Sequence, residues 1–480
     1  MPTVARVIAD QLKVCGVDHF FCVTGGDQPL WIALDDVGIT IVPCRSEHAA
    51  AYAADGYARL TGRPAFVYGQ FGPGVASVAS GLADAYWAMS PVVSLTSSTR
   101  TRSRYRFEYQ ELDQVPMHAP VTKWAATVPR PDRAAELARA AIRQAVGVPP
   151  GPVHLELPAD MLGEEVGDQA VYRLPAFAQI PGPRVGADPS TLAGEGAIAE
   201  THDLALGVVG RYSRKVANDI LAEADLVLAV GTRLGGLATD GWRKPSARAR
   251  IIHIDADPAV LGATYREEVS ILADARLGLA ALTAEIRGRG DGGRGDGGGP
   301  GTWAKRAGER VQAWRGEVAK AQASSRPGAR HPAAVIAAVR DALEPADILV
   351  ADTGYMGAWT GALFEVTEAG RHYLRAAGSL GWAFPASIGA SLAAPDATVL
   401  CVSGDGGIGY HLMELRRRRR RRRGRRHPGD AARAARARAG QGDQRARPVP
   451  GGRPGGQGGA CAGERVRADG AACCLARSWP

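Results

Sequence analysis

The chain has 480 residues, of which 45% are hydrophobic and 22% charged, and its formal net charge at pH 7 is +9. The last 65 residues hold 19 Arg and four acidic residues, a net charge of +15, so residues 1–415 carry a net charge of −6. The main part of the chain is therefore mildly acidic and long enough for several domains, which excludes a protein that coats nucleic acid with a generally basic surface.

The sequence also lacks the patterns that direct a protein across a membrane. No run reaches the length of about 18 apolar residues that a membrane-spanning helix requires. Residues 1–17 predict an amphipathic helix and lack the apolar core of a signal peptide. The seven cysteines show neither metal-binding nor disulfide-framework spacing. We therefore expect a cytoplasmic protein with no membrane partner.

The first region, residues 1–165, alternates short apolar runs with helical patterns such as residues 134–146. The apolar runs are residues 19–23, 39–42, 65–68, 92–95 and 153–157. This alternation predicts a parallel sheet that is covered by helices on both faces.

Two further regions repeat the alternation. Residues 190–286 contain predicted strands at 226–230 and 251–254, and residues 331–415 contain strands at 348–351 and 399–403. Residues 231–236 (GTRLGG) form either an ordinary turn after a strand or a dinucleotide-binding turn, although they do not match GxGxxG. Residues 287–302 are rich in glycine and predict a flexible linker, followed by a helix from about residue 303 to 323. The fold class is thus α/β, with three Rossmann-like, doubly wound parallel-sheet domains.

Residues 416–480 break this pattern. Arg, Gly, Ala and Pro supply 49 of the 65 residues, too little apolar surface for a core, and we expect disorder. Codons for these four residue types begin with two G or C bases, so a frameshift in a GC-rich gene accounts for the composition. The eight consecutive arginines at 416–423 would bind nucleic acid only non-specifically, because no aromatic side chains are interleaved with them.

Two short motifs carry candidate chemistry. Glu47 follows an apolar strand and opens a helix rich in small residues. Such a Glu can be a catalytic carboxylate or only a favourable partner of the helix dipole. Gly404-Asp405-Gly406 directly follows the last strand of the third region. Glycines around one Asp suit a metal-binding carboxylate beside a phosphate, and they also suit an ordinary turn.

Together and in this order, the motifs resemble the thiamine-diphosphate-dependent enzyme family that includes the acetolactate synthase large subunit. Further segments share the resemblance: residues 71–74 (FGPG), 81–86 (GLADAY), 109–113 (YQELD), 121–123 (VTK) and 377–390 (AGSLGWAFPASIGA). The resemblance covers most of residues 1–415. It implies a pyrimidine-binding domain at 1–165, a central domain at 190–286 and a diphosphate-binding domain at 331–415.

The resemblance also implies roles for particular residues. Glu47 matches the carboxylate that activates thiamine diphosphate through its aminopyrimidine ring, Leu380 the apolar side chain beneath the two rings of the cofactor, and Asp405 a Mg²⁺ ligand. Other matching positions lie beside the cofactor (Gly26, Gly72, Gly404, Gly406) or on the substrate side (Gln110, Lys123). For the last two, a role as solvated surface groups stays open.

The implied reaction is decarboxylation of a 2-oxo acid such as pyruvate, with transfer of the two-carbon unit to a second carbonyl compound, as in branched-chain amino acid biosynthesis. Another 2-oxo acid decarboxylase or an acyl-transferring lyase stays open. In the family, the Glu-bearing domain of one subunit faces the Gly-Asp-Gly domain of another, so a homodimer or homotetramer is implied.

The sequence departs from the family at three places. The Asn residues expected after Gly-Asp-Gly are missing, since residues 431–439 hold only Ala and Arg, which truncates the third domain. The strand–helix unit that opens the central domain is deleted near residue 190. Residues 233–236 (RLGG) replace the stretch found in relatives that bind FAD, so the sequence does not favour FAD. The first two departures leave an inactive, truncated remnant with no turnover as an alternative.

Overall fold

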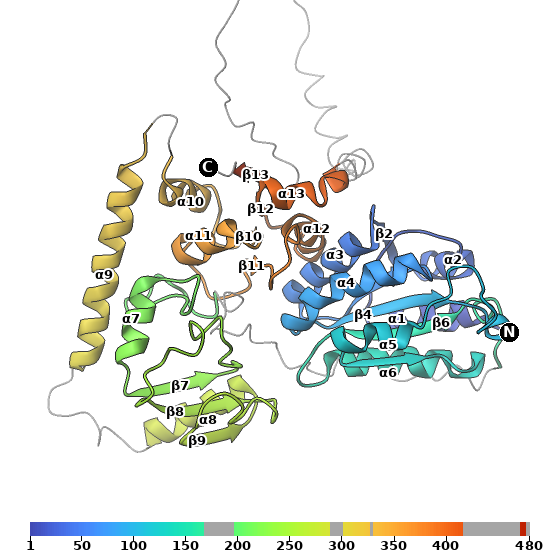
Figure 1. Cartoon of the computed structure of the whole chain (residues 1–480), viewed down its shortest axis with the longest axis horizontal. Helices are drawn as coiled ribbons and strands as arrows, with labels where there is room; N and C mark the ends of the chain where they lie inside the picture. Colours follow the sequence, from blue (N-terminus) through green and yellow to red (C-terminus); the bar gives the residue numbers. More distant parts are fainter. Residues whose placement is uncertain (168–195, 289–300, 327–329, 416–470, 477–480) are drawn as a thin grey trace, which may run out of the picture.

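The computed structural model describes residues 1–167, 196–288, 301–326 and 330–415, together with the backbone of residues 471–476. These residues form three parallel sheets, each with its own helices (Figure 1). The predicted fold class is confirmed. No helix in the described parts is long and apolar enough to cross a bilayer.

The first domain is built on a six-stranded parallel sheet with the order β2-β1-β3-β4-β6-β5. Its strands are β1 (His19–Cys22), β2 (Thr40–Pro43), β3 (Ala65–Gly69), β4 (Val92–Ser98), β5 (Trp124–Thr127) and β6 (Val153–Pro158). Its helices are α1 (Val4–Val14), α2 (Gln28–Asp36), α3 (Glu47–Thr61), α4 (Pro73–Trp87), α5 (Gln114–His118) and α6 (Ala134–Val146). Five strands and α6 lie where the sequence predicts them, whereas β5 was not predicted.

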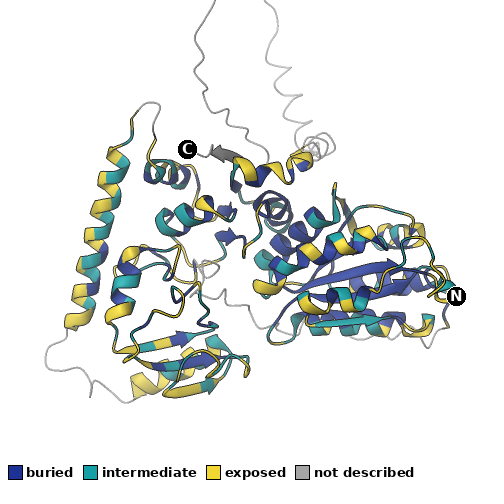
Figure 2. Cartoon of the chain, viewed as in Figure 1, coloured by how far each residue is buried: buried dark blue, intermediate teal, exposed yellow. Residues whose placement is uncertain are grey.

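Helices cover both faces of this sheet, as expected. Phe20 points into the core beneath α1, α2 and α6, and its neighbour Phe21 points into the core beneath α3 and α4. This alternation follows from the strand period of two. The central strands are consequently buried along their whole length (Figure 2).

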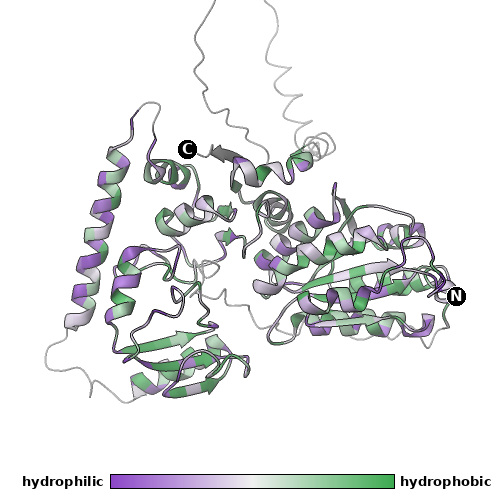
Figure 3. Cartoon of the chain, in the orientation of Figure 1, coloured by the Kyte–Doolittle hydropathy of each residue, from purple (hydrophilic) through white to green (hydrophobic). Residues whose placement is uncertain are grey.

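The second domain is smaller and less buried. It comprises α7 (Lys215–Glu223), β7 (Leu226–Val230), β8 (Arg250–Asp255), β9 (Val269–Leu272) and α8 (Ala275–Gly288), with the strand order β7-β8-β9. Leu226 and Leu228 of β7 are exposed, and α8 buries no residue. The strands are apolar in Figure 3 although parts of them are exposed in Figure 2. Turns and no helix follow β7, so residues 231–236 form the ordinary turn.

The third domain has the strand order β11-β10-β12-β13, all parallel. Its strands are β10 (Ile348–Ala351), β11 (Tyr373–Arg375), β12 (Val399–Gly404) and β13 (Ala471–Ala476). Its helices are α10 (Pro332–Asp341), α11 (Tyr355–Leu363), α12 (Ala383–Ala393) and the short α13 (Asp405–Gly409), and the long α9 (Thr302–Ala323) precedes them.

One segment of the tail belongs to the described residues. Residues 471–476 form β13 beside β12. Strand β12 therefore has neighbours on both sides, β10 and β13, instead of lying at an edge. The rest of the predicted tail, the linker at 289–300 and the connector at 168–195 lie outside the described residues.

The first and third domains meet along α3 and α12, which lie side by side in Figure 1. A Cβ added at Gly56 of α3 would lie 2.3 Å from the carbonyl oxygen of Ala386, and one added at Gly389 of α12 would lie 1.8 Å from that of Ala53. The two backbones therefore touch, and only glycine fits at these positions.

Candidate active site

Glu47 is the first residue of α3, and three residues separate it from the end of β2. The helix begins there because the Ser46 hydroxyl accepts a hydrogen bond from the Ala49 amide, at 3.1 Å. The half-buried Glu47 side chain lies over the first turn of α4, where a Cβ added at Gly74 would be 2.9 Å from Glu47 Oε1. The glycine leaves a cradle for this carboxylate that any other residue would fill.

Gly72 and Gln110 meet beside this cradle. Gly72 precedes α4 with a φ of +78°, and a Cβ there would lie 2.5 Å from Gln110 Cβ. Gln110 itself has a φ of +63°, a conformation that is uncommon outside glycine. The structure thus brings together three of the residues predicted from the sequence, Glu47, Gly72 and Gln110.

Gly26 lies in the turn after β1, at the same edge of the sheet. The neighbouring Gly25 accepts a hydrogen bond from the Trp31 indole through its carbonyl oxygen, at 3.1 Å. A Cβ at Gly26 would lie 3.9 Å from Gln70 Nε2. Gln70 was not predicted, although its place directly after β3 and before Phe71-Gly72 is a signal that could have found it.

Lys123 does not join this group. Its amino group donates to the carbonyl oxygens of Gln144 (3.0 Å), Gly147 (2.8 Å) and Pro149, at the end of α6. Lys123 precedes β5, whereas Gly26, Glu47 and Gly72 follow their strands. Because all strands are parallel, Lys123 lies at the opposite edge of the sheet. In this chain it closes the C-terminus of a helix.

In the third domain, Gly404-Asp405-Gly406 spans the end of β12 and the start of α13. The exposed Asp405 carboxylate accepts a hydrogen bond from the Gly406 amide, at 2.8 Å. Among the described residues, no three His, Cys, Asp or Glu side chains group as metal ligands. Asp405 is therefore a single protein carboxylate, to which a metal would need to add other oxygen ligands.

Leu380 lies in the turn before α12, and 49% of its surface is exposed. The next residue, Gly381, donates its amide to Asp352, which also accepts the Ser403 hydroxyl at 2.6 Å. A Cβ at Gly407 of α13 would lie 2.4 Å from Asp352 Oδ2. Asp352 thus connects Leu380 with the Gly-Asp-Gly turn, and its burial raises the pKa of its carboxyl group. It was not predicted, although an Asp after the strand at 348–351 repeats the pattern of Asp405.

The single chain also brings the two halves of the site together. The Glu414 carboxylate, nine residues after Asp405, accepts a hydrogen bond from the Arg45 amide at 2.6 Å. The rings of His48 and His411 are 5.3 Å apart, and burial lowers the pKa of both. The start of α3 therefore contacts the segment that follows the Gly-Asp-Gly turn.

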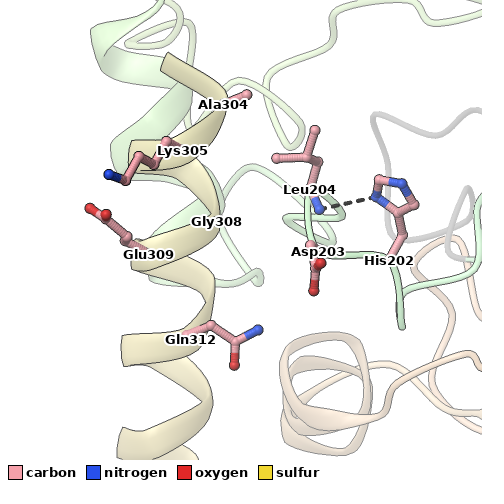
Figure 4. A pocket seen from close by; sticks show the side chains of 8 residues that line it. All are labelled: His202, Asp203, Leu204, Ala304, Lys305, Gly308, Glu309 and Gln312. Carbon is pink, nitrogen blue, oxygen red and sulfur yellow. Dashed lines mark hydrogen bonds between the residues drawn. The ribbon is translucent and has the colours of Figure 1, made fainter. Parts of the chain in front are cut away.

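A separate cavity of about 630 Å³ lies between α9 and residues 202–204 (Figure 4). Lys305 and Glu309 point away from the opposite segment, and the amide of Leu204 donates to the ring of His202 at 3.1 Å. The cavity shares no residue with the predicted site.

Comparison with known proteins agrees with the geometry. Three family models of thiamine pyrophosphate enzymes match the chain. They are the N-terminal TPP binding domain at residues 2–117, the central domain at 189–282 and the C-terminal TPP binding domain at 352–423. The fold and these matches define a three-domain enzyme of the class that binds thiamine pyrophosphate (thiamine diphosphate).

Individual relatives within this class carry the names of different activities. A probable acetolactate synthase large subunit of Methanocaldococcus jannaschii is 30% identical, over 86% of this chain and 77% of the relative. A sulfoacetaldehyde acetyltransferase of Alcaligenes xylosoxydans xylosoxydans is also 30% identical, over 83% and 76%. A probable 2-ketoarginine decarboxylase of Pseudomonas aeruginosa is 31% identical, over 86% and 79%. The chain belongs to the thiamine-diphosphate-dependent enzyme family, as the sequence predicted.

Proposed function

We propose that the chain is a carboligase of the acetolactate synthase type, which decarboxylates a 2-oxo acid and transfers the two-carbon unit to a second carbonyl compound. The observation that carries this proposal is the placement of Glu47 over Gly74, beside Gly72 and Gln110. It combines a half-buried carboxylate with close-lying glycine backbone at the edge of a parallel sheet. The relatives also include an acetyltransferase and a decarboxylase, so an acyl-transferring lyase or a simple decarboxylase is the second candidate.

The residues present fit thiamine diphosphate. Glu47 would accept a hydrogen bond from the aminopyrimidine ring, and Leu380 offers an exposed apolar side chain beneath the two rings. Gly26, Gly404 and Gly406 would allow close approach of the cofactor. When bound, the cofactor supplies a thiazolium carbon that stabilises the negative charge left by decarboxylation.

Asp405 would bind Mg²⁺ together with the diphosphate oxygens. Its carboxylate is exposed at the start of α13, where an incoming cation can reach it. Mg²⁺ usually binds one or two protein carboxylates and completes its octahedral shell with phosphate oxygens and water. The proposed shell therefore depends strongly on the diphosphate, so cofactor binding should depend on Mg²⁺.

Glu47→Gln tests the proposed chemistry. The amide keeps the size of the side chain but cannot hold the negative charge that shifts the cofactor's proton equilibrium. We expect turnover of pyruvate to fall by about 100-fold or more, while Mg²⁺-dependent thiamine diphosphate binding, measured by calorimetry with and without a chelator, stays within a few-fold. Glu136→Gln, at an exposed position of α6, is the matched control and should leave both unchanged.

Three results would count against this proposal. Retained turnover in Glu47→Gln would remove Glu47 from the chemistry. Decarboxylation of pyruvate without transfer of the two-carbon unit to a second carbonyl compound would favour the simple decarboxylase. A wild-type chain that neither binds the cofactor nor turns over would favour the inactive remnant, consistent with residues 431–439, which hold only Ala and Arg.

We also propose a homodimer whose interface includes the loop at residues 101–113. Tyr105, Phe107 and Tyr109 are 87%, 100% and 78% exposed. Hydrogen bonds from the amides of Tyr105 and Glu108 to the Glu111 carboxylate hold the loop. Such rigid aromatic side chains are typical of interface anchors. The loop continues into Gln110 and therefore into the site, which favours a second copy of this chain as the partner.

Phe107→Glu tests this interface. A charge at this position of the proposed interface should raise the dissociation constant of the dimer at least tenfold, as measured by sedimentation velocity. The circular dichroism spectrum should stay unchanged. Trp87→Glu, which alters another exposed aromatic residue on α4, serves as the control. A wild-type chain that is monomeric at micromolar concentration would contradict the proposal.

A further inference from the structure

Two buried carboxylates hold the backbone on either side of Leu380. Asp84 Oδ2 accepts the amide of Ala377 and Asp84 Oδ1 accepts that of Ser379, both at 2.9 Å. Asp352 accepts the amide of Gly381 through both oxygens, at 3.0 and 3.1 Å. Asp84 and Asp352 are 2% and 0% exposed. The half-exposed Leu380 thus lies between two fixed points of a short loop.

Asp84 is itself held in place by a buried network. Arg59 donates to Asp84 at 2.8 Å and to Asp55 at 2.6 Å, and Asp55 also accepts the indole N–H of Trp382 at 2.8 Å. The Arg59 guanidinium lies 4.4 Å from the centre of the Trp382 ring. Because charged hydrogen bonds inside a protein are stronger and shorter than neutral ones, this network restricts the loop tightly.

The loop conformation needs such support. Gly381 has a φ of +82°, and a Cβ there would lie 2.7 Å from Tyr410 Cβ and 3.0 Å from the carbonyl oxygen of Gly407. The loop therefore packs directly against the segment that begins with Asp405. A shift of the loop would move Leu380 relative to the Gly-Asp-Gly turn.

Asp84 belongs to a different domain from the loop that it holds. It lies near the end of α4, and Gly74 in the first turn of the same helix forms the cradle for Glu47. One helix of the first domain therefore contacts Glu47 at one end and the loop that carries Leu380 at the other. A single rigid element relates the two positions.

We propose that Asp84 is a positioning residue, which sets the position of Leu380 beneath the cofactor through its two hydrogen bonds to the backbone of the third domain. This inference rests on the proposed function for the role of Leu380, but the hydrogen bonds themselves do not. Docking of the first domain would then complete the cofactor site of the third.

Asp84→Asn is the direct test. An amide has only one acceptor atom, so its NH2 group must face either the Ala377 or the Ser379 amide, donor against donor. Asp55→Asn is the matched control, because it weakens the same Arg59 pairing but touches neither amide, and its remaining oxygen can still accept from Trp382. Both variants and the wild type are compared by thermal unfolding, Mg²⁺–thiamine diphosphate calorimetry and residue-resolved hydrogen exchange.

We expect Asp84→Asn to weaken cofactor binding at least tenfold and to speed exchange of the Ala377 and Ser379 amides at least tenfold in the cofactor-free chain. Asp55→Asn should lower the melting temperature similarly but leave both quantities within about threefold of wild type. If the two variants weaken cofactor binding equally, Asp84 only stabilises the fold and the inference is wrong. Unchanged cofactor binding in Asp84→Asn would also overturn it.

The two proposals fail separately. If the wild type does not bind thiamine diphosphate, the proposed function fails, and the exchange of Ala377 and Ser379 alone then decides whether Asp84 holds the loop. If those amides exchange equally fast in the wild type and in Asp84→Asn, the positioning role is wrong even when the wild type binds the cofactor.

Discussion

At the residue scale, the first domain contains a stacked pair of buried imidazoles. The rings of His118 and His154 lie 3.7 Å apart and only 8° from parallel. The Nδ1–H of His118 donates to the carbonyl oxygen of Gln114 at 3.0 Å, and His154 Nδ1 lies 3.4 Å from the Ser94 hydroxyl. Burial lowers the pKa of His118 to about 4 and also lowers the pKa of His154. The folded chain therefore keeps both rings neutral at physiological pH.

This pair predicts a loss of stability in mild acid. Between pH 6.5 and about 4, an unfolded His118 binds a proton that the folded residue does not, so the free energy of unfolding falls as the pH falls through this range and levels off below it. His118→Phe keeps a stacked ring but removes one titrating group. We expect the stability difference between wild type and this variant to shrink from pH 7 to pH 4.5 in urea titrations.

The comparison isolates His118 because other buried groups titrate in both proteins. Burial raises the pKa of Asp27 and Asp352, whose protonation stabilises the fold as the pH falls and so opposes the effect of the histidines. These contributions cancel in the difference. A difference that does not change with pH would show that His118 does not titrate in this range.

At the element scale, the packing of α3 against α12 depends on small residues. The run of Ala and Gly in residues 49–58 leaves room for a second helix backbone, and Gly56 and Gly389 mark the closest approaches. The same helix begins with Glu47 at one end. The small residues of this helix thus place the candidate catalytic residue beside the third domain.

Gly389→Ala should disrupt this contact. The added methyl group would overlap the Ala53 carbonyl oxygen, and overpacking of this kind costs about 1–3 kcal/mol. Gly316→Ala is the control, because Gly316 lies inside α9 with no atom within 4 Å of the added Cβ, and there alanine should stabilise the helix by roughly 0.5–1 kcal/mol. Thermal unfolding of both variants checks the opposite signs, and a stable Gly389→Ala would contradict the close packing.

At the scale of the whole molecule, one buried arginine joins the second and third domains. Arg214, just before α7, donates to Glu200 at 2.8 Å and to the carbonyl oxygens of Ala362 (3.0 Å) and Phe364 (3.1 Å). Its guanidinium also lies 4.7 Å from the centre of the Trp314 ring on α9. These partners come from three segments of the chain, so the arginine holds several parts of the chain together.

Arg214→Met should destabilise the chain by about 3–5 kcal/mol, because it leaves Glu200 buried without its charged partner. The adjacent Lys215→Met removes an exposed ion pair with Asp219 and should leave stability almost unchanged. Urea midpoints of the two variants test the contrast. Equal midpoints would show that the pair with Glu200 contributes no more than a surface ion pair.

The sequence alone determined the fold class, most of the strands and the family. These properties depend on local patterns, since hydrophobic periodicity sets the elements and short glycine-containing motifs mark the ends of strands. Glu47, Gly72 and Gln110 lie close together because the segments that follow β2, β3 and β4 leave the parallel sheet at the same edge. Strands β5, β9, β11 and β13 were not predicted.

Features that depend on long-range contacts were decided only by the tertiary structure. It placed Lys123 at the opposite edge of the first sheet, paired residues 471–476 with β12, and brought Asp84 and Asp352 to the two sides of Leu380. A spacing pattern in the sequence carries no information about hydrogen bonds between residues almost 300 positions apart. Those bonds arise when the first and third domains pack together, because burial then requires each carboxylate to find donors.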